Sequence, residues 1–290
     1  MKASETLRAP AKLNLALEVL QRRDDGLHAL RTVMVPVDLC DELDIAPSAQ
    51  PSFTCDAAEL QDGNLVERAL RAVGASAVSV HLRKHIPTGA GMGGGSSDAA
   101  AILLAAQRGI LGNVPEVNYL ECARSLGSDV PFFLVETGAL VEGTGERVTA
   151  LGPVPQWHAV VVKPPVSVST AWAYQQIDAA QKPSRPRNTS VSLQLAEALQ
   201  RSDFDHVVSL LHNDFEDVLA PVTAEIQTAL DALHAAGADR ALMTGSGSCV
   251  FALARTADAA QAIASDVHVP AGYRLFRCAF WNGEGWRNAA

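Results

Sequence analysis

The residues best suited to bind a charged ligand lie in a glycine-rich run at residues 87–100, which reads PTGAGMGGGSSDAA. Glycine has no Cβ, so it reaches positive φ angles and lets backbone N–H groups approach the oxygens of a ligand. Ser96, Ser97 and Asp98 then open an alanine-rich helical pattern, and the unpaired N–H groups of a first helical turn favour a phosphate. A half-buried strand pattern at residues 78–82 precedes the run. The order of strand, glycine loop and helix predicts a phosphate-binding loop.

Three kinds of phosphate loop compete for this run, and residue types separate them. Gly89, Gly91 and Gly94 satisfy the dinucleotide pattern G-x-G-x-x-G, but that loop turns directly off a strand, and residues 84–88 intervene here. The P-loop pattern fails because no lysine stands between Gly95 and the serines. The pattern that fits is P-x-x-x-G-x-G-x-S-S-x-A-A with one additional glycine, in which backbone and serine hydroxyls hold a nucleotide triphosphate. A flexible glycine linker is disfavoured by the compact patterns on both sides.

Lys12 and Asn14 form a second polar pair with a defined geometry. Within residues 7–20, leucine or valine recurs at every second position from Leu13 to Val19, which predicts a strand with one apolar face. Because side chains alternate between the two faces of a strand, Lys12 and Asn14 point to the same side. The strand alone leaves two interpretations open: this side is a solvated outer face, or it presents both polar groups to a ligand.

The rest of the chain alternates between strand and helix patterns. Further strands are expected at residues 30–39, 158–162 and 274–280, and a hairpin with glycines at its corners at residues 138–148. Helices are expected at residues 66–73, 99–106, 116–125, 169–180, 192–199, 204–211, 221–236 and 257–265. Residues 47–56 show no clear periodicity, so a loop is expected there, and residues 38–45 are expected to end the strand pairing. The order of elements in the second half suits a split βαβ, antiparallel α+β layer.

Composition bounds the class of protein. At 290 residues the chain exceeds what one core usually organises, and Pro153 and Pro155 mark a boundary, so we predict domains at residues 1–155 and 156–290. The formal net charge of −9 opposes nonspecific binding to nucleic acid or membranes. No apolar run approaches a membrane span and the start lacks a signal-peptide pattern, so the protein is expected in the cytoplasm. The five cysteines are widely spaced, which predicts free thiols and no metal site made of side chains.

Three motifs, in order along the chain, resemble the GHMP kinases, the superfamily of galactokinase, homoserine kinase and mevalonate kinase. They are PAKLNL at residues 10–15, the glycine run, and a second glycine loop, MTGSGSCVF, at residues 243–251. Shorter signatures are similar to those of the GHMP subgroup that phosphorylates a cytidine diphosphate-linked polyol in the non-mevalonate isoprenoid route. They are AKLNL at residues 11–15, DGLH at 25–28, GMGGGSSDAA at 91–100, GSDVPF at 127–132 and NDFE at 213–216. The resemblance covers nearly the whole chain. It implies an α+β fold with two domains, an N-terminal α/β nucleotide-binding domain and a C-terminal ferredoxin-like α+β domain.

The resemblance also implies an ATP-dependent transfer to the 2-hydroxyl of a methylerythritol unit, with Mg²⁺ carried on ATP. Asp129 is expected to accept the proton of the substrate hydroxyl, and Lys12 to lie beside it and keep it ionised. Phosphoryl transfer depends chiefly on positioning and charge, and a carboxylate near the attacking hydroxyl is the usual base. The implied substrate-side residues are Asn14, His28, Thr170 and Tyr174. The implied nucleotide-side residues are Asn64, Pro87, Gly89, Gly91, Gly93, Gly94, Gly95, Ser96 and Ser97, the last also assisting the metal.

One departure and several alternatives accompany the resemblance. The subgroup usually has a tyrosine before the histidine, where its ring helps hold cytosine, whereas this chain has Leu27. Another GHMP activity, of the homoserine or phosphomevalonate type, is an alternative because glycine loops report ATP and not the acceptor. A nucleotide sensor without catalysis is a second alternative, against which the presence of both Lys12 and Asp129 argues. Both a monomer and a homodimer fit the sequence. The local cations available for a diphosphate are Lys12, Arg22, Arg23, Arg185 and Arg187.

Overall fold

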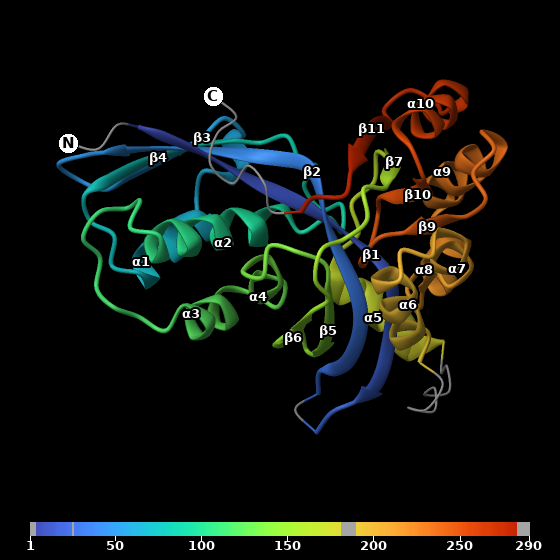
Figure 1. The fold of residues 1–290 in the computed structure, drawn as a ribbon, viewed down its shortest axis with the longest axis horizontal. Helices are drawn as coiled ribbons and strands as arrows, with labels where there is room; N and C mark the ends of the chain where they lie inside the picture. The colour runs from blue at the N-terminus through green and yellow to red at the C-terminus, as the bar shows by residue number, and fades with distance from the viewer. Residues whose placement is uncertain (1–3, 25, 181–189, 283–290) are drawn as a thin grey trace.

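The computed structural model describes residues 4–24, 26–180 and 190–282, which form two β-sheets with helices packed against them (Figure 1). The larger sheet contains β1 (Glu5–Arg22), β2 (His28–Pro47), β3 (Ser52–Cys55), β4 (Val78–Arg83), β5 (Ala139–Gly143), β6 (Arg147–Ala150) and β8 (His212–Asn213). Its main strand order is β3-β4-β2-β1-β8, and the β5–β6 hairpin joins it through β2. The smaller sheet has the order β11-β7-β10-β9, with β7 (His158–Lys163), β9 (Ala241–Met243), β10 (Val250–Ala254) and β11 (Arg274–Ala279).

The hairpin of β1 and β2 is the longest element and links both halves of the molecule (Figure 1). The predicted alternation in β1 is confirmed, since Leu13 and Leu15 are buried in the core. The opposite face is buried too: Lys12 is 3% exposed and Asn14 is 1% exposed. The interpretation of this face as a solvated surface is therefore wrong.

Two expectations about the strands that follow were also wrong. β2 does not end its pairing at residues 38–45 but continues to Pro47, because residues 42–47 pair with β4 on one side while β1 continues on the other. The segment expected to be a loop, residues 47–56, contains β3, which pairs with β4 in parallel. Both strands are stabilised by a partner distant in sequence, which local periodicity does not reveal.

Four helices pack on the larger sheet and share one hydrophobic core with it: α1 (Leu65–Ala72), α2 (Gly94–Gln107), α3 (Tyr119–Leu126) and α4 (Val130–Phe133). A short 3₁₀ turn, Ala58–Leu60, precedes α1. Residues 99–106 of α2 are all buried, and five of these eight are alanine, so α2 lies close to its neighbours. The start of this helix is thereby held firmly behind the glycine loop.

The second half of the chain covers the smaller sheet and also reaches back to the larger one. Its helices are α5 (Thr170–Ala179), α6 (Val191–Gln200), α7 (Phe204–Ser209), α8 (Glu216–Leu219), the 3₁₀ turn Ala220–Val222, α9 (Ala224–Ala235) and α10 (Ala257–Asp266). Strand β8 pairs with β1 in parallel, and Leu195 and Leu199 of α6 pack in one core with Leu13 and Leu15. A division at residue 155 stays our proposal for the domain boundary, with α6 and β8 lying across it.

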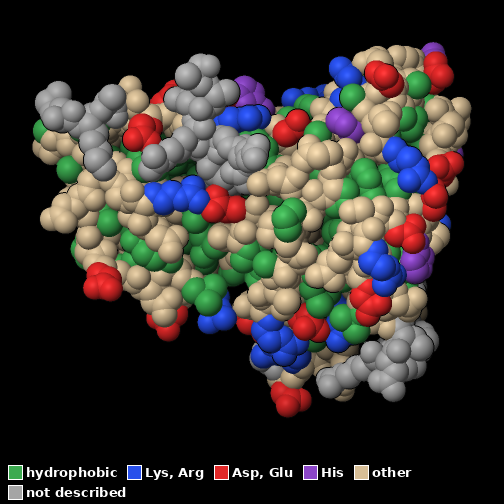
Figure 2. All heavy atoms as spheres, viewed as in Figure 1, with side chains coloured by type: hydrophobic (Ala, Val, Ile, Leu, Met, Phe, Trp, Pro, Cys, Tyr) green, Lys and Arg blue, Asp and Glu red, His purple; other side chains and the backbone are tan. Residues whose placement is uncertain are grey.

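The surface charges, the helix lengths and the cysteines can each be compared with what the composition predicts. On the face shown in Figure 2, lysine and arginine side chains are interspersed with acidic ones and do not form one basic patch. No helix in the described part of the chain is long and apolar enough to cross a membrane. All five cysteines are free thiols, as expected.

Candidate active site

The glycine run separates two cavities. One, of about 250 Å³, is named the Lys12 cavity and lies between β1, β2, the Asp129 turn, α5 and the second glycine loop. The other, of about 420 Å³, is named the Asn64 cavity and lies between the start of α1, the end of β4 and the start of α2. Gly89, Gly91 and Gly93 line both. Two ligands bound in the two cavities would therefore be separated by one layer of glycine backbone.

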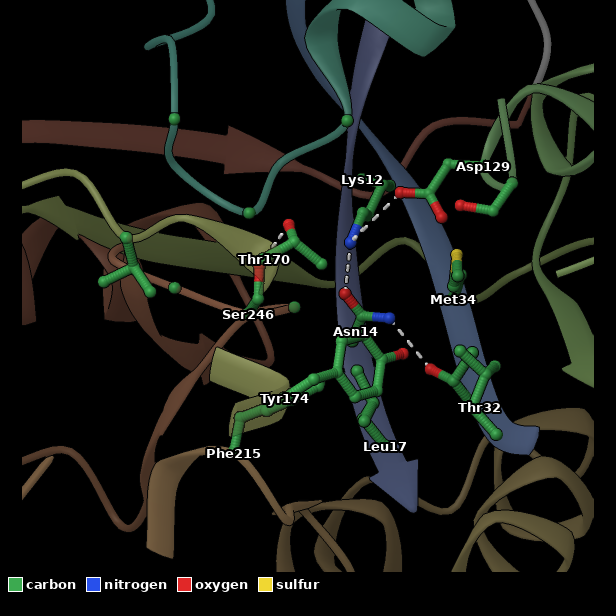
Figure 3. A pocket seen from close by; sticks show the side chains of 18 residues that line it. Lys12, Asn14, Leu17, Thr32, Met34, Asp129, Thr170, Tyr174, Phe215 and Ser246 are labelled. Atoms are coloured by element: carbon green, nitrogen blue, oxygen red, sulfur yellow. Dashed lines mark hydrogen bonds and ion pairs between the residues drawn. The ribbon is translucent and has the colours of Figure 1, made fainter. Parts of the chain in front are cut away.

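Lys12 and Asp129 meet in the Lys12 cavity (Figure 3). The Lys12 Nζ lies 3.9 Å from the Asp129 Oδ2 and donates a hydrogen bond to the Asn14 Oδ1. Burial lowers the pKa of Lys12, and the charge of Asp129 opposes this shift. Asp129 precedes α4 in a turn that the Val130 N–H closes on the Gly127 carbonyl, and its side chain is 31% exposed. The pair combines a buried ammonium with a carboxylate that remains open to the cavity.

Asn14 is placed as predicted beside Lys12, but its amide is engaged with the protein. Its Nδ2 donates to the Thr32 Oγ1 at 2.8 Å (Figure 3). Its backbone N–H donates to the Thr244 Oγ1 at 3.0 Å. The Thr32 hydroxyl donates in turn to the Ala16 carbonyl at 2.6 Å, which leaves its oxygen as the acceptor for Asn14. This chain of bonds fixes the amide so that its oxygen faces the Lys12 ammonium. Sequence reasoning did not name Thr32 as a site residue.

The second glycine loop contributes residues that the sequence analysis identified as a motif without assigning them a role. Gly245, Ser246 and Gly247 line the Lys12 cavity, and the Ser246 Oγ lies 3.1 Å from the Thr170 Oγ1. Thr170, which the sequence analysis expected on the substrate side, also lines this cavity. The signal in the sequence was the run of small residues between two apolar strands.

An aromatic row borders the same cavity. Tyr174 lines it and stacks on His28, with ring centroids 5.1 Å apart and an interplanar angle of 12°. Burial raises the pKa of Tyr174 to about 12, so its hydroxyl stays protonated. The His28 Nε2 lies 2.9 Å from the Asp178 Oδ1, and His28 is not among the residues that line the cavity. His28 is thus placed behind Tyr174, at the edge of the site.

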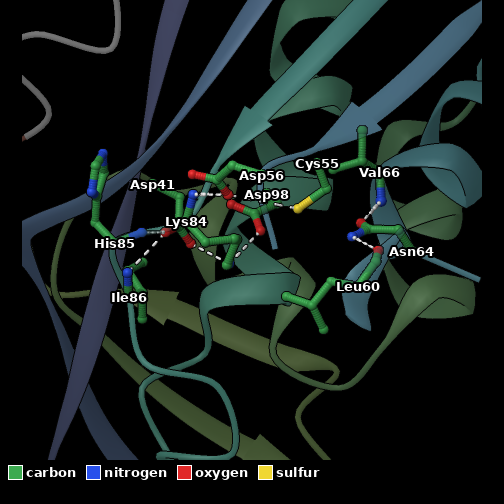
Figure 4. Close-up of polar contacts among 10 residues, drawn as sticks. All are labelled: Asp41, Cys55, Asp56, Leu60, Asn64, Val66, Lys84, His85, Ile86 and Asp98. Atoms are coloured by element: carbon green, nitrogen blue, oxygen red, sulfur yellow. Dashed lines mark hydrogen bonds and ion pairs between the residues drawn. The ribbon is translucent and has the colours of Figure 1, made fainter. Parts of the chain in front are cut away.

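The Asn64 cavity brings together most of the predicted nucleotide-side residues. They are Asn64, Pro87, Gly89, Gly91, Gly93, Gly94, Gly95 and Ser96. Asn64 also caps α1: its Oδ1 accepts from the Val66 N–H and its Nδ2 donates to the Leu60 carbonyl, each at 2.9 Å (Figure 4). Ser97 is fully buried, lines neither cavity, and its hydroxyl has no partner among the described residues. Its role stays a prediction.

The glycines of the run are required by packing as well as by any ligand. Gly91 has φ +73°, and a Cβ there would collide with the backbone carbonyl oxygen of Thr244. Gly93 also has φ +73°, and a Cβ there would lie 3.1 Å from the Lys12 Cγ. The backbone N–H of Lys12 donates to the Met92 carbonyl at 3.0 Å. The glycine run is therefore packed closely against the second glycine loop and joined to Lys12 by a backbone hydrogen bond.

The predicted cations are not all brought to the site. Lys12 lines its cavity, whereas the Arg22 Nε bonds to the Gly26 carbonyl at the hairpin tip and Arg23 lies 4.0 Å from Glu146. Arg185 and Arg187 lie outside the described residues, as does Asp25 of the DGLH signature.

Two cavities separated by a glycine wall, with an ammonium and a carboxylate paired in one of them, are the arrangement expected of a small-molecule phosphotransferase. The model of the GHMP kinases N terminal domain matches residues 64–137, and that of the GHMP kinases C terminal domain matches residues 195–269. The chain belongs to the GHMP kinase family. The predicted α+β, two-domain GHMP architecture is confirmed.

Curated relatives specify the subgroup. A Geobacter sulfurreducens protein named 4-diphosphocytidyl-2-C-methyl-D-erythritol kinase is 40% identical, over 88% of this chain and 91% of its own. A Citrifermentans bemidjiense protein of the same name is 38% identical, over 92% of this chain and 95% of its own. A crystal structure of 4-(cytidine 5'-diphospho)-2C-methyl-D-erythritol kinase superposes with a TM-score of 0.79 at 36% identity, covering 96% of this chain and all of that one. A crystal structure of a homoserine kinase from Cytophaga hutchinsonii shares the fold, with a TM-score of 0.69 at 22% identity. The match covers 98% of this chain and 97% of that one.

Proposed function

We propose that this protein transfers the γ-phosphoryl group of ATP to the 2-hydroxyl of 4-diphosphocytidyl-2-C-methyl-D-erythritol, a step of the non-mevalonate isoprenoid route. The observation that carries the proposal is the Lys12–Asp129 pair, which faces a cavity across the glycine wall from a second cavity. Relatives about 40% identical over nearly the whole chain, all bearing the name of that kinase, support the choice of substrate.

In this proposal the acceptor occupies the Lys12 cavity, and its attacking hydroxyl lies against Asp129. Asp129 takes the hydroxyl proton as the phosphoryl group is transferred. The ammonium of Lys12 favours the ionised carboxylate and faces the charge that develops on the transferred group. Asn14 and Thr32 act by holding that ammonium in place.

ATP fits the Asn64 cavity because the glycine run there can present backbone N–H groups to phosphate oxygens at the start of the 14-residue helix α2. Mg²⁺ carried on the nucleotide phosphates would offset part of their charge. Asn64 and Pro87 line this cavity and not the Lys12 cavity, and we assign the adenine end of ATP to them.

The cytidyl end of the acceptor is assigned to the aromatic row. Tyr174 and His28 offer a flat face and a ring edge with hydrogen-bonding atoms, which suit a planar base. Leu27, in place of the usual tyrosine, is 55% exposed at the hairpin tip. A branched aliphatic side chain supplies contact area there without an aromatic face. We also propose a cytoplasmic location and a monomeric or homodimeric state.

The test is an acceptor screen by ADP release with the purified protein, comparing 4-diphosphocytidyl-2-C-methyl-D-erythritol, homoserine and phosphomevalonate. We expect kcat/KM for the cytidyl acceptor to exceed that for the others by at least ~10²-fold, because polar sites reject ligands that leave their groups unpaired. Phosphorus NMR of the product should show one new phosphate monoester. Asp129→Asn, prepared identically, controls for contaminating kinases. Preferential turnover of homoserine or phosphomevalonate, or none with any acceptor, refutes the proposal.

A further inference from the structure

Three ionisable residues meet at the wall of the Asn64 cavity: Asp41 of β2, Lys84 directly after β4, and Asp98 in the second turn of α2 (Figure 4). The side chains of Asp41 and Asp98 are 0% and 1% exposed. The Lys84 Nζ donates to the Asp41 Oδ2 and, at 2.8 Å, to the Asp98 Oδ2. We name this set the loop clamp. None of its members was singled out as catalytic or nucleotide-binding.

The loop clamp joins the two ends of the glycine run. Asp41 accepts the backbone N–H groups of His85 at 2.6 Å and Ile86 at 2.8 Å, the two residues before Pro87 (Figure 4). Asp98 lies just beyond the last glycine, in α2. The Lys84 ammonium therefore connects the end of β4 to helix α2. The Asp41 carboxylate fixes the backbone of His85 and Ile86, which lie between the two.

We propose that the loop clamp sets the shape of the phosphate-binding loop and thereby the affinity for ATP, and that Lys84 acts as a positioning residue and not as a phosphate ligand. This rests on the proposed function in one respect, namely that the Asn64 cavity takes the nucleotide.

The charges explain why Lys84 is assigned to the loop and not to the phosphates. Lys84 and Asp98 both line the Asn64 cavity, so the ammonium is near enough to invite the opposite assignment. Moving it to a phosphate would remove the countercharge of the buried Asp41 and the donor to the Asp98 Oδ2, and an uncompensated buried charge is strongly destabilising. Burial and the neighbouring Asp41 raise the pKa of Asp98 to about 8, which already reflects how little charge this place tolerates.

The experiment compares three clamp variants with a matched control. Lys84→Met and Asp98→Ala break the clamp, whereas Asp98→Asn keeps an oxygen that accepts from Lys84. Arg83→Met is the control, because Arg83 is the preceding residue and pairs with Glu42 and Asp44 across the same two strands, but its side chain is 35% exposed and lines neither cavity. ATP affinity is measured by titration without acceptor, and KM for ATP and for the cytidyl acceptor by steady-state kinetics.

We expect Lys84→Met and Asp98→Ala each to weaken ATP binding by roughly 10- to 100-fold, because each removes a buried hydrogen bond of the ammonium that joins the two ends of the loop. The KM for the acceptor should change less than about twofold, and Asp98→Asn and Arg83→Met should bind ATP like the parent. Hydrogen exchange at the His85 and Ile86 amides should be faster in Lys84→Met and Asp98→Ala alone. If Lys84→Met does not fold, Asp98→Ala and Asp98→Asn still decide the question.

Two results would overturn the inference. If Lys84 binds phosphate directly, Asp98→Ala frees it and ATP affinity stays equal or rises. If exchange at His85 and Ile86 is unchanged in a folded Asp98→Ala protein, the clamp does not hold the loop. Failure of the parent protein to bind ATP would instead reject the proposed function, while the exchange rates would still report on the clamp.

Discussion

Replacing Asp129 by asparagine is the most informative perturbation of the proposed site. The change keeps the shape of the side chain and removes its charge and its ability to accept a proton. General-base catalysis typically contributes ~10²- to 10⁴-fold, which corresponds to about 3 to 5 kcal/mol of barrier. We therefore expect kcat to fall by roughly that factor while ATP binding in the neighbouring cavity is retained.

The structure adds a second consequence through Lys12. Two unit charges 3.9 Å apart attract each other by about 4 kcal/mol at an effective dielectric constant of ~20, before the solvent that reaches Asp129 reduces this value. Burial already lowers the pKa of Lys12, and Asp129 is the charge that opposes this. Without that charge the pKa of Lys12 falls further, so the asparagine variant also loses part of the ammonium. Lys12→Met should consequently lower kcat as well.

A double-mutant cycle tests this coupling. Because the two groups act as one unit, Lys12→Met combined with Asp129→Asn should lose much less turnover than the product of the single losses. The measurement is steady-state ADP release at saturating substrates, with ATP titration and thermal unfolding to verify that each variant is folded. Near-parental turnover of Asp129→Asn would mean that proton removal is unnecessary or occurs elsewhere. Losses that multiply would mean that Lys12 serves the phosphates independently of Asp129.

Three further predictions address packing, specificity and pH. Gly91→Ala forces a side chain against the second glycine loop at positive φ, so it should lower the free energy of unfolding, measured by denaturant titration, by ~1 to 3 kcal/mol. The control is Gly95→Ala, whose Cβ would lie 3.6 Å from its nearest neighbour and whose stability should stay near that of the parent. Equal stabilities of the two variants would refute the packing argument. His28→Ala removes the ring stacked on Tyr174 and should raise the KM for the cytidyl acceptor about 10-fold with the KM for ATP unchanged, whereas equal kinetics for both would remove His28 from the site. The pKa of Asp98 in the folded protein is raised to about 8, so the folded chain retains a proton that the unfolded chain releases near its ordinary pKa of 3.8. The free energy of unfolding should therefore fall as the pH rises from 5 to 8, and Asp98→Asn should flatten this fall. Identical slopes for the parent and Asp98→Asn would contradict the prediction.

The pH prediction depends on the groups that surround Asp98. Asp41 raises its pKa and Lys84 lowers it, while burial is the largest cause of the upward shift. Cys55 lies within reach of the same charges, and burial raises the pKa of its thiol. The thiol keeps its proton in the folded chain, and the unfolded chain, with an ordinary thiol pKa of 9.0, also keeps it over most of pH 5 to 8, so Cys55 adds little slope in that window.

The features that sequence alone predicted are those set by short-range pattern. The alternation in β1 placed Lys12 and Asn14 on one face, and the structure joins them by a hydrogen bond. The order of strand, glycine run and helix is likewise confirmed by β4 and α2. Each of these depends on residues within about one turn or one strand of one another, where side-chain spacing is sufficient information.

The features that escaped prediction depend on partners far apart in the chain. Asn14 is fixed by Thr32 and by Thr244, which is 230 residues away. Lys84 meets Asp41 only because β2 and β4 are neighbours, and β3 forms only because β4 offers it an edge. In each case an ordinary threonine, lysine or aspartate acquires its role from strand pairing, which a single sequence does not reveal.

The two halves of the proposed site differ in how tightly the fold confines them. On the nucleotide side, the glycine run is confined on three sides: Gly91 by the second glycine loop, Gly93 by Lys12, and its ends by the loop clamp. A side chain added there would press on Lys12 and on the second glycine loop, and would thereby disturb the loop that we propose for ATP. On the acceptor side, Leu27 and His28 lie at a hairpin tip and Tyr174 on a separate helix, and none supports the core of the glycine wall. If the proposed function holds, substitutions at these three positions should change the contacts to the acceptor and leave the Lys12–Asp129 pair in place.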